Sequence, residues 1–158
     1  MNQKYVESFS DAFLTVMPQV GITDVQLQNE EECGNIIRSP GVVVIFEMSG
    51  NLKGNVFFAM HENCAKMLAS TLMCGMEVEE LDEMAQSAVS ELGNMLAANA
   101  CTNLSDCDAG IVADISTPKF IHGDFTANAS SEHTARLELK ANEHPFYIYV
   151  SVEKVSCQ

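Results

Sequence analysis

Basic side chains are scarce in this sequence. Its 158 residues contain Lys+Arg 8 against Asp+Glu 22, which gives a formal net charge of −14. The only two arginines are Arg38 and Arg136. Proteins that bind the phosphate backbone of nucleic acids do so with clustered Lys and Arg side chains. The composition therefore excludes a general nucleic-acid binder and an arginine-rich anion site.

Long hydrophobic stretches are also missing. The longest apolar runs, Val42–Phe46 and Val56–Met60, are five residues each, far shorter than a membrane span. Near the N-terminus, Glu7 and Asp11 interrupt any apolar core of a signal peptide. We therefore expect a cytoplasmic protein with no membrane partner.

Metal-binding and disulfide patterns are absent as well. No Cys-x-x-Cys occurs, and His122, His133 and His144, eleven residues apart, match no compact zinc motif. Without a secretory signal, the cysteines are expected to be reduced thiols. The six cysteines are Cys33, Cys64, Cys74, Cys101, Cys107 and Cys157. We expect no bound metal.

The hydrophobic content, 47% of residues, is sufficient for a folded core, and the length suits one domain over 1–158. Periodicity predicts helices over 4–17, ending before Pro18, over 62–74, and over about 82–103. Alternation predicts a short strand at 25–27 that fades into the Glu30–Glu32 run, and further strands at 42–46, 56–60, 110–117, 135–140 and 146–152. The order of elements predicts an α+β domain with helices, one of them long, covering an antiparallel sheet.

The long helix carries three polar residues in line. Ser87, Glu91 and Asn94 occupy positions i, i+4 and i+7, away from the centre of the apolar face. A rigid helix holding a hydroxyl, a carboxylate and an amide suits a functional site. From spacing alone, a solvated helix face is the simpler interpretation, since Glu32–Asn35 shows the same Glu-x-x-Asn spacing in a turn-rich stretch.

The whole segment from Ser87 to Ala100, SAVSELGNMLAANA, resembles the signature helix of the CheC/CheX/FliY family of chemotaxis phosphatases. The hairpin at Gly50–Val56 and the segment Asp114–Pro118 are similar to those that this family places before and after its motif helix. The single copy of the pattern points to the CheX branch rather than to two-site CheC. One position departs from the pattern: Ala98 stands where a small residue, often glycine, is common.

The resemblance implies hydrolysis of the aspartyl phosphate on a phosphorylated CheY-like response regulator. Asn94 would hold the attacking water through its amide oxygen, and Glu91 would pair with the active-site lysine of the regulator. Ser87 would contact the partner or form a hydrogen bond within its own helix. Mg²⁺ is expected on the partner receiver, and no cofactor is expected on this chain.

The resemblance also implies a homodimer formed through the sheets, for which we expect the terminal strands 135–140 and 146–152 to supply an edge. The alternative function is a module that binds a receiver or a flagellar switch component without hydrolysis. Because both this chain and a receiver's phosphorylation pocket are acidic, association is expected to speed up with added salt.

Three other features have structural interpretations. His61–Cys64 forms a strand-to-helix junction, where polar caps are ordinary, rather than a cysteine nucleophile site. Asn99 falls on the apolar side of the long helix and is expected to be a hydrogen-bonded core amide. Four methionines around the helix junction are expected to fill the core, with a flexible partner surface as the alternative. They are Met67, Met73, Met76 and Met84.

Overall fold

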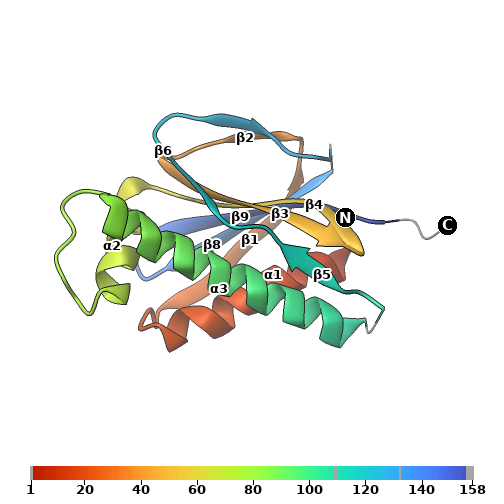
Figure 1. The fold of residues 1–158 in the computed structure, drawn as a ribbon, viewed down its shortest axis with the longest axis horizontal. Helices are drawn as coiled ribbons and strands as arrows, with labels where there is room; N and C mark the ends of the chain where they lie inside the picture. The colour runs from red at the N-terminus through yellow and green to blue at the C-terminus, as the bar shows by residue number, and fades with distance from the viewer. Residues whose placement is uncertain (1, 109, 132, 156–158) are drawn as a thin grey trace.

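The computed structural model describes residues 2–108, 110–131 and 133–155. Its helices are α1 (Gln3–Gln19), α2 (Glu62–Leu72) and α3 (Glu83–Cys107). Its strands are β1 (Val25–Cys33), β2 (Ile36–Arg38), β3 (Val42–Gly50), β4 (Leu52–Met60), β5 (Ala113–Ile115), β6 (Lys119–His122), β7 (Thr126–Asn128), β8 (Thr134–Ala141) and β9 (His144–Lys154). Figure 1 shows the helices on one side of the sheet. The predicted α+β class is confirmed.

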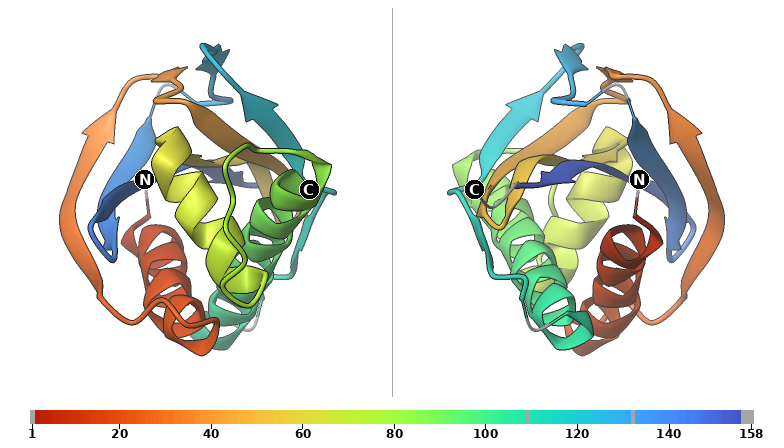
Figure 2. Two further views of the ribbon diagram at one scale, coloured as in Figure 1. Left: turned by 90° about the vertical axis from the view of Figure 1, so that its left-hand side faces the viewer. Right: turned by 90° about the vertical axis from the view of Figure 1, so that its right-hand side faces the viewer.

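One antiparallel sheet organises the fold. Its strand order is β1-β8-β9-β4-β3-β5, and β6 also pairs with β3. The sheet curves around the three helices, and the two-stranded ribbon of β2 and β7 lies over its opposite face (Figure 2). Each face of the central strands is therefore covered, one by helices and the other by the ribbon.

This double covering explains why β3 is apolar at successive positions. Val44 and Phe46 belong to the large core beneath the helices, whereas Val43 and Ile45 pack on the ribbon side with Ile37 of β2. A strand buried on both faces loses the alternation that marks a half-exposed strand. The predicted hairpin at 42–60 is confirmed, with the strands extending to Gly50 and Leu52.

The first helix ends later than predicted. Pro18 lies inside the last turn of α1, which ends at Gln19, and the N–H of Val20 donates to the carbonyls of that turn. Proline lacks a backbone N–H donor, and its ring crowds only the turn that precedes it. The residues around it at the end of a helix can therefore still be helical. The other helices, predicted over 62–74 and 82–103, end at Leu72 and Cys107.

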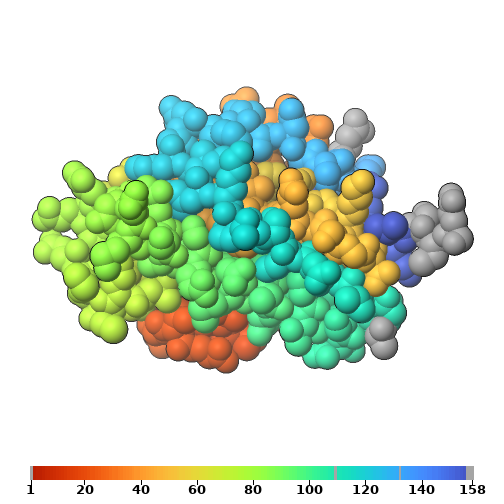
Figure 3. Space-filling model, viewed as in Figure 1, coloured from red at the N-terminus to blue at the C-terminus, as the bar shows by residue number. Residues whose placement is uncertain are grey.

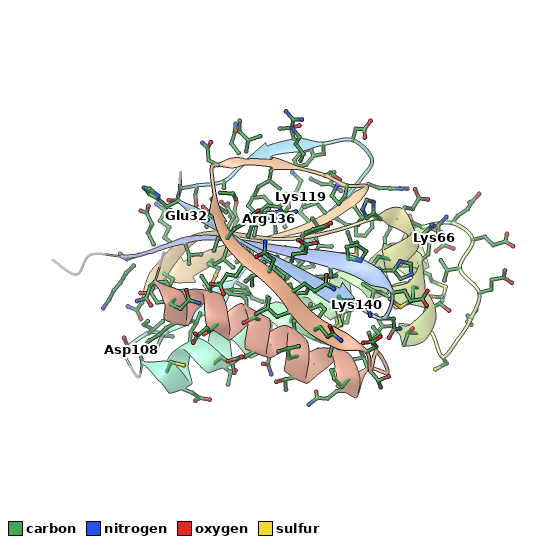
Figure 4. All side chains as sticks on the ribbon, turned by 180° about the vertical axis from the view of Figure 1, so that it is seen from behind. Glu32, Lys66, Asp108, Lys119, Arg136 and Lys140 are labelled. Atoms are coloured by element: carbon green, nitrogen blue, oxygen red, sulfur yellow. The ribbon has the colours of Figure 1, made fainter. Side chains whose placement is uncertain are left out.

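The prediction that the first strand fades at the glutamates is wrong. β1 continues through them to Cys33 because β8 pairs with its whole length and supplies opposite charges. Arg136 lies 3.0 Å from Glu31, and Lys140 lies 3.2 Å from Asp24, just before the strand. Arg136 and Lys140 lie along β8 beside β1 in Figure 4. The strand predicted at 110–117 is shortened to β5, and the short β2, β6 and β7 were not predicted.

The terminal strands are not edges of the sheet. β8 lies between β1 and β9, and β9 lies between β8 and β4, so neither presents unpaired backbone groups. The expected dimer edge was therefore assigned to the wrong strands, because pairing of β1 with β8 was not predicted. β1 is the outer strand on that side. The homodimer stays a prediction, and light scattering at micromolar concentration tests it.

Among the described residues, no helix is both long and apolar enough to span a membrane.

Candidate functional site

The long helix α3 is fixed at its start and along its inner face. The Asp82 carboxylate accepts a hydrogen bond of 2.9 Å from the N–H of Ala85 and so caps the helix. Val89, Leu92 and Leu96 are buried in the core beneath the sheet. A capped helix with a continuous buried face gives its outward side chains fixed positions.

Gly93 brings α3 close to the sheet. A Cβ at this position would lie 3.2 Å from Cε2 of Phe46 and 3.3 Å from Cγ1 of Val44. Because glycine carries no side chain, the helix backbone approaches β3 directly at this point. Gly93 immediately precedes Asn94, so this close contact also sets the distance of Asn94 from the sheet.

Ser87, Glu91 and Asn94 form one stripe on the outer side of α3. Ser87 and Glu91 are exposed and Asn94 is half-buried, opposite to the buried face of the helix. No side-chain hydrogen bond or ion pair joins any of the three to another residue in the described ranges. The outer surface of α3 faces the viewer in Figure 3. The structure thus brings together all three predicted residues and leaves them available to a partner.

The stripe combines a negative charge with a neutral amide and a hydroxyl. A carboxylate can pair with a cation, and the amide of Asn94 offers one acceptor oxygen and two N–H donors. Neither group is a strong nucleophile, and an amide cannot act as a strong base. The arrangement can orient a water molecule and bind a cationic group, but the bond that is broken has to belong to another molecule.

Ala98 continues the same stripe one turn beyond Asn94. Its side chain is exposed, and its carbonyl accepts the Thr102 hydroxyl at 3.3 Å. The methyl group of Ala98, which the glycine of the family pattern lacks, therefore points to the outer surface. It narrows the approach of a partner backbone by one methyl group.

The segment around α3 carries charge of only one sign. Residues 67–118 contain no Lys and no Arg. Their carboxylates stand at Glu77, Glu79, Glu80, Asp82, Glu83, Glu91, Asp106, Asp108 and Asp114. A partner with an acidic pocket gains no long-range attraction toward this part of the molecule.

The cysteine alternative is excluded by burial. Cys64 is fully buried in the core, and burial raises the pKa of its thiol to about 12. A thiol that stays protonated at neutral pH is a poor nucleophile. The cysteines in the described part of the chain are free, and Cys157 lies outside the described residues.

The equally spaced histidines do not converge. His122 pairs with Glu62 at 3.3 Å, and His133 pairs with Glu32 at 2.6 Å, on separate parts of the surface. His144 begins β9. Within residues 2–108, 110–131 and 133–155, no group of three or more His, Cys, Asp or Glu side chains could hold a metal ion.

The two other asparagines of interest are structural. Asn99 is half-buried and its amide oxygen accepts from Asn103, which also donates to the Ser8 carbonyl of α1 at 3.0 Å. The predicted hydrogen bond is confirmed, but the side chain is half-buried rather than inside the core. In the second Glu-x-x-Asn copy, Glu32 lies in β1 and Asn35 at a bend, so no helix aligns the two side chains.

The methionine prediction is half wrong. Met67 and Met73 pack partly buried against the core, whereas Met76 and Met84 are 57% and 63% exposed. Met84 lies in the first turn of α3 on its outer side, and Met76 lies in the connection before the helix. The signal that could have placed Met84 outside was its spacing, three residues before Ser87 and seven before Glu91.

Sequence comparison matches residues 42–141 to the family model "Chemotaxis phosphatase CheX", a range that contains the entire stripe. The chain is 29% identical over 113 residues to the CheY-P phosphatase CheX of Thermotoga maritima. This alignment covers 71% of the chain and 72% of that relative.

Solved structures share the fold. A CheC-like superfamily protein from Shewanella sp. PV-4 superposes with a TM-score of 0.84 at 23% identity, over 97% of this chain and 99% of that one. The CheX–CheY–BeF3–Mg²⁺ complex from Borrelia burgdorferi contains a chain with a TM-score of 0.75 at 21% identity, over 95% and 98% of the two chains. At these identities the likeness establishes the fold alone.

Proposed function

Because the chain belongs to the CheX family of chemotaxis phosphatases, we propose that it hydrolyses the aspartyl phosphate of a CheY-like response regulator. Asn94 positions the attacking water, and Glu91 pairs with the active-site lysine of the regulator. The relative from Thermotoga maritima is a CheY-P phosphatase, and the solved complex pairs a CheX with a CheY. Both support a phosphorylated receiver as the partner.

The proposal rests on the observation that the side chains of the stripe are exposed and can bind another molecule. Glu91 is exposed and Asn94 half-exposed on a capped helix that Gly93 holds against the sheet. Neither side chain has a partner among the described residues, so their hydrogen-bonding capacity remains for another molecule. A solvated helix face would show the same exposure; the family match, whose range includes these residues, supports a functional role for them.

Hydrolysis requires a water molecule placed in line with phosphorus. The amide oxygen of Asn94 accepts one water hydrogen and directs the water oxygen at the phosphoryl group. The new phosphorus–oxygen bond forms as the bond to the aspartyl oxygen breaks, and the aspartate leaves as a carboxylate with the bonding electrons. Both hydrogens of the water remain on the released phosphate. The contribution of Asn94 is therefore orientation of the nucleophile.

Glu91 fixes how the two proteins meet. A carboxylate that loses its water against one lysine favours a single docking register over others. Charge on the phosphoryl group is neutralised by Mg²⁺ and the lysine that belong to the receiver. This chain needs no cofactor of its own in the scheme. Ser87, one turn before Glu91, contacts the receiver at the periphery of the same interface.

Replacing Glu91 with alanine is expected to weaken binding of the activated receiver about tenfold, because the lysine of the receiver loses its charged partner. Turnover at low receiver concentration falls by at least the same factor. Titration of the receiver measures the dissociation constant. Glu7→Ala removes the same charge from an exposed position on α1 and controls for the change in net charge. Equal affinities for the two variants would remove Glu91 from the interface.

A further inference from the structure

Two exposed methionines lie beside the start of the motif helix. Met84 and Met76 are 63% and 57% exposed, although methionine is usually buried. Both line one open groove with a volume of about 370 Å³, together with Met73 and Val78. We call Met76 and Met84 the methionine patch. Figure 3 shows this segment, 73–84, at one end of the outer surface formed by α3.

The methionine patch is continuous with the stripe. At about 100° per residue, Met84 falls on the same side of α3 as Ser87 and Glu91. It lies about 10 Å from Glu91 along the helix axis. A globular domain of about 100 residues has a radius of gyration of about 13 Å. A receiver centred on Glu91 and Asn94 is therefore large enough to reach Met84.

Charge cannot supply the affinity at this end of the helix. The groove that holds the methionine patch is rimmed by Glu77, Glu79, Glu80 and Asp82, and no basic residue lies between 67 and 118. A receiver pocket that holds Mg²⁺ is acidic, so the two surfaces repel each other apart from the Glu91 contact. Burial of apolar side chains is a source of binding free energy that does not require opposite charges.

We propose that the methionine patch is the apolar part of the receiver-binding surface and selects receivers with an apolar surface beside the phosphorylated aspartate. This inference rests on the proposed function, because the occupant is the same receiver that docks on Glu91 and Asn94. Methionine suits such a contact because its unbranched side chain adapts to the opposing surface.

The test measures binding of a CheY-like receiver activated with BeF3⁻ and Mg²⁺, and turnover of the phosphorylated form. Met84→Ala is expected to raise the dissociation constant about tenfold and to leave the rate at saturation unchanged. Met84→Leu restores most of the affinity, since it restores the apolar area. Ile36→Ala is the matched control, because Ile36 is 60% exposed on the ribbon at the opposite side of the sheet.

Unchanged affinity in Met84→Ala and Met76→Ala, with turnover still dependent on Asn94, would overturn the inference and leave the phosphatase intact. Loss of a dimer in Met84→Ala, seen by light scattering, would assign the patch to a second copy of this chain and also overturn it. Affinity that holds or rises with added salt supports apolar contact. A steep loss of affinity with salt would show charge pairing instead.

Discussion

Replacing Asn94 with alanine is expected to slow hydrolysis at saturating phosphorylated receiver about 100-fold, while the dissociation constant changes less than about threefold. The reason is that the amide acts on the attacking water, and misplacing a reacting group by about 1 Å costs on that order. Binding depends on Glu91 and on the wider surface, which the substitution leaves in place. Stopped-flow decay of the phosphorylated receiver at several receiver concentrations separates the two quantities.

The chain offers a matched control for this substitution. Asn35 ends the second Glu-x-x-Asn copy and is half-buried like Asn94, but it lies at a bend outside any helix. Asn35→Ala should leave hydrolysis unchanged. Equal rates for Asn94→Ala and the wild-type protein would refute the assigned mechanism.

The second large effect is expected at Gly93. Gly93→Val should lower the free energy of unfolding by about 2 to 3 kcal/mol, because the added side chain enters the contact with Phe46 and Val44. The cavity beside Gly93 has a volume of about 10 Å³, far too small for two further methyl groups. Urea denaturation measures the loss.

The same substitution should also reduce hydrolysis in the fraction that remains folded. A valine at this position pushes α3 away from β3 and moves Asn94 relative to the docked receiver. Gly93→Ala is the graded control, because its single methyl group is partly offset by the better helix propensity of alanine. A folded Gly93→Val protein with wild-type stability and turnover would show that the close approach of helix and sheet is unimportant.

The periodic elements could be predicted from the sequence. The buried face of α3 and the alternating strands β8 and β9 carry strong signals, so their existence and approximate ends follow from local patterns. The Ser87, Glu91 and Asn94 alignment follows in turn from helix geometry alone. These are properties of single segments, which need no knowledge of the rest of the chain.

The predictions that failed concern segments whose structure depends on residues far away in the sequence. β1 continues through Glu30–Glu32 because β8 pairs with it and Arg136 meets Glu31, a contact over more than 100 residues of sequence. The ribbon of β2 and β7 has only three residues in each strand and packs on one face of the larger sheet. Met84 was assigned to the core because apolar residues usually lie there, although its spacing from Ser87 and Glu91 already placed it on the outer side of the helix, where it is exposed.

The chemistry of the site could not come from spacing. Glu32–Asn35 and Glu91–Asn94 share the same pattern, yet only the second lies on a helix that displays both side chains. The proposed hydrolysis acts on a phosphoryl group carried by another protein, and the spacing of residues in this chain cannot identify that protein. The family resemblance suggested a receiver as the partner, and the exposed stripe is compatible with that proposal.

The most direct test is the decay of a phosphorylated CheY-like receiver in the presence of Mg²⁺ and substoichiometric amounts of this protein. If the protein is a phosphatase, decay should accelerate in proportion to the protein added, and each molecule should dephosphorylate many receivers. Binding of the phosphorylated receiver without any change in its phosphate lifetime would rule out the phosphatase and identify a binding module instead.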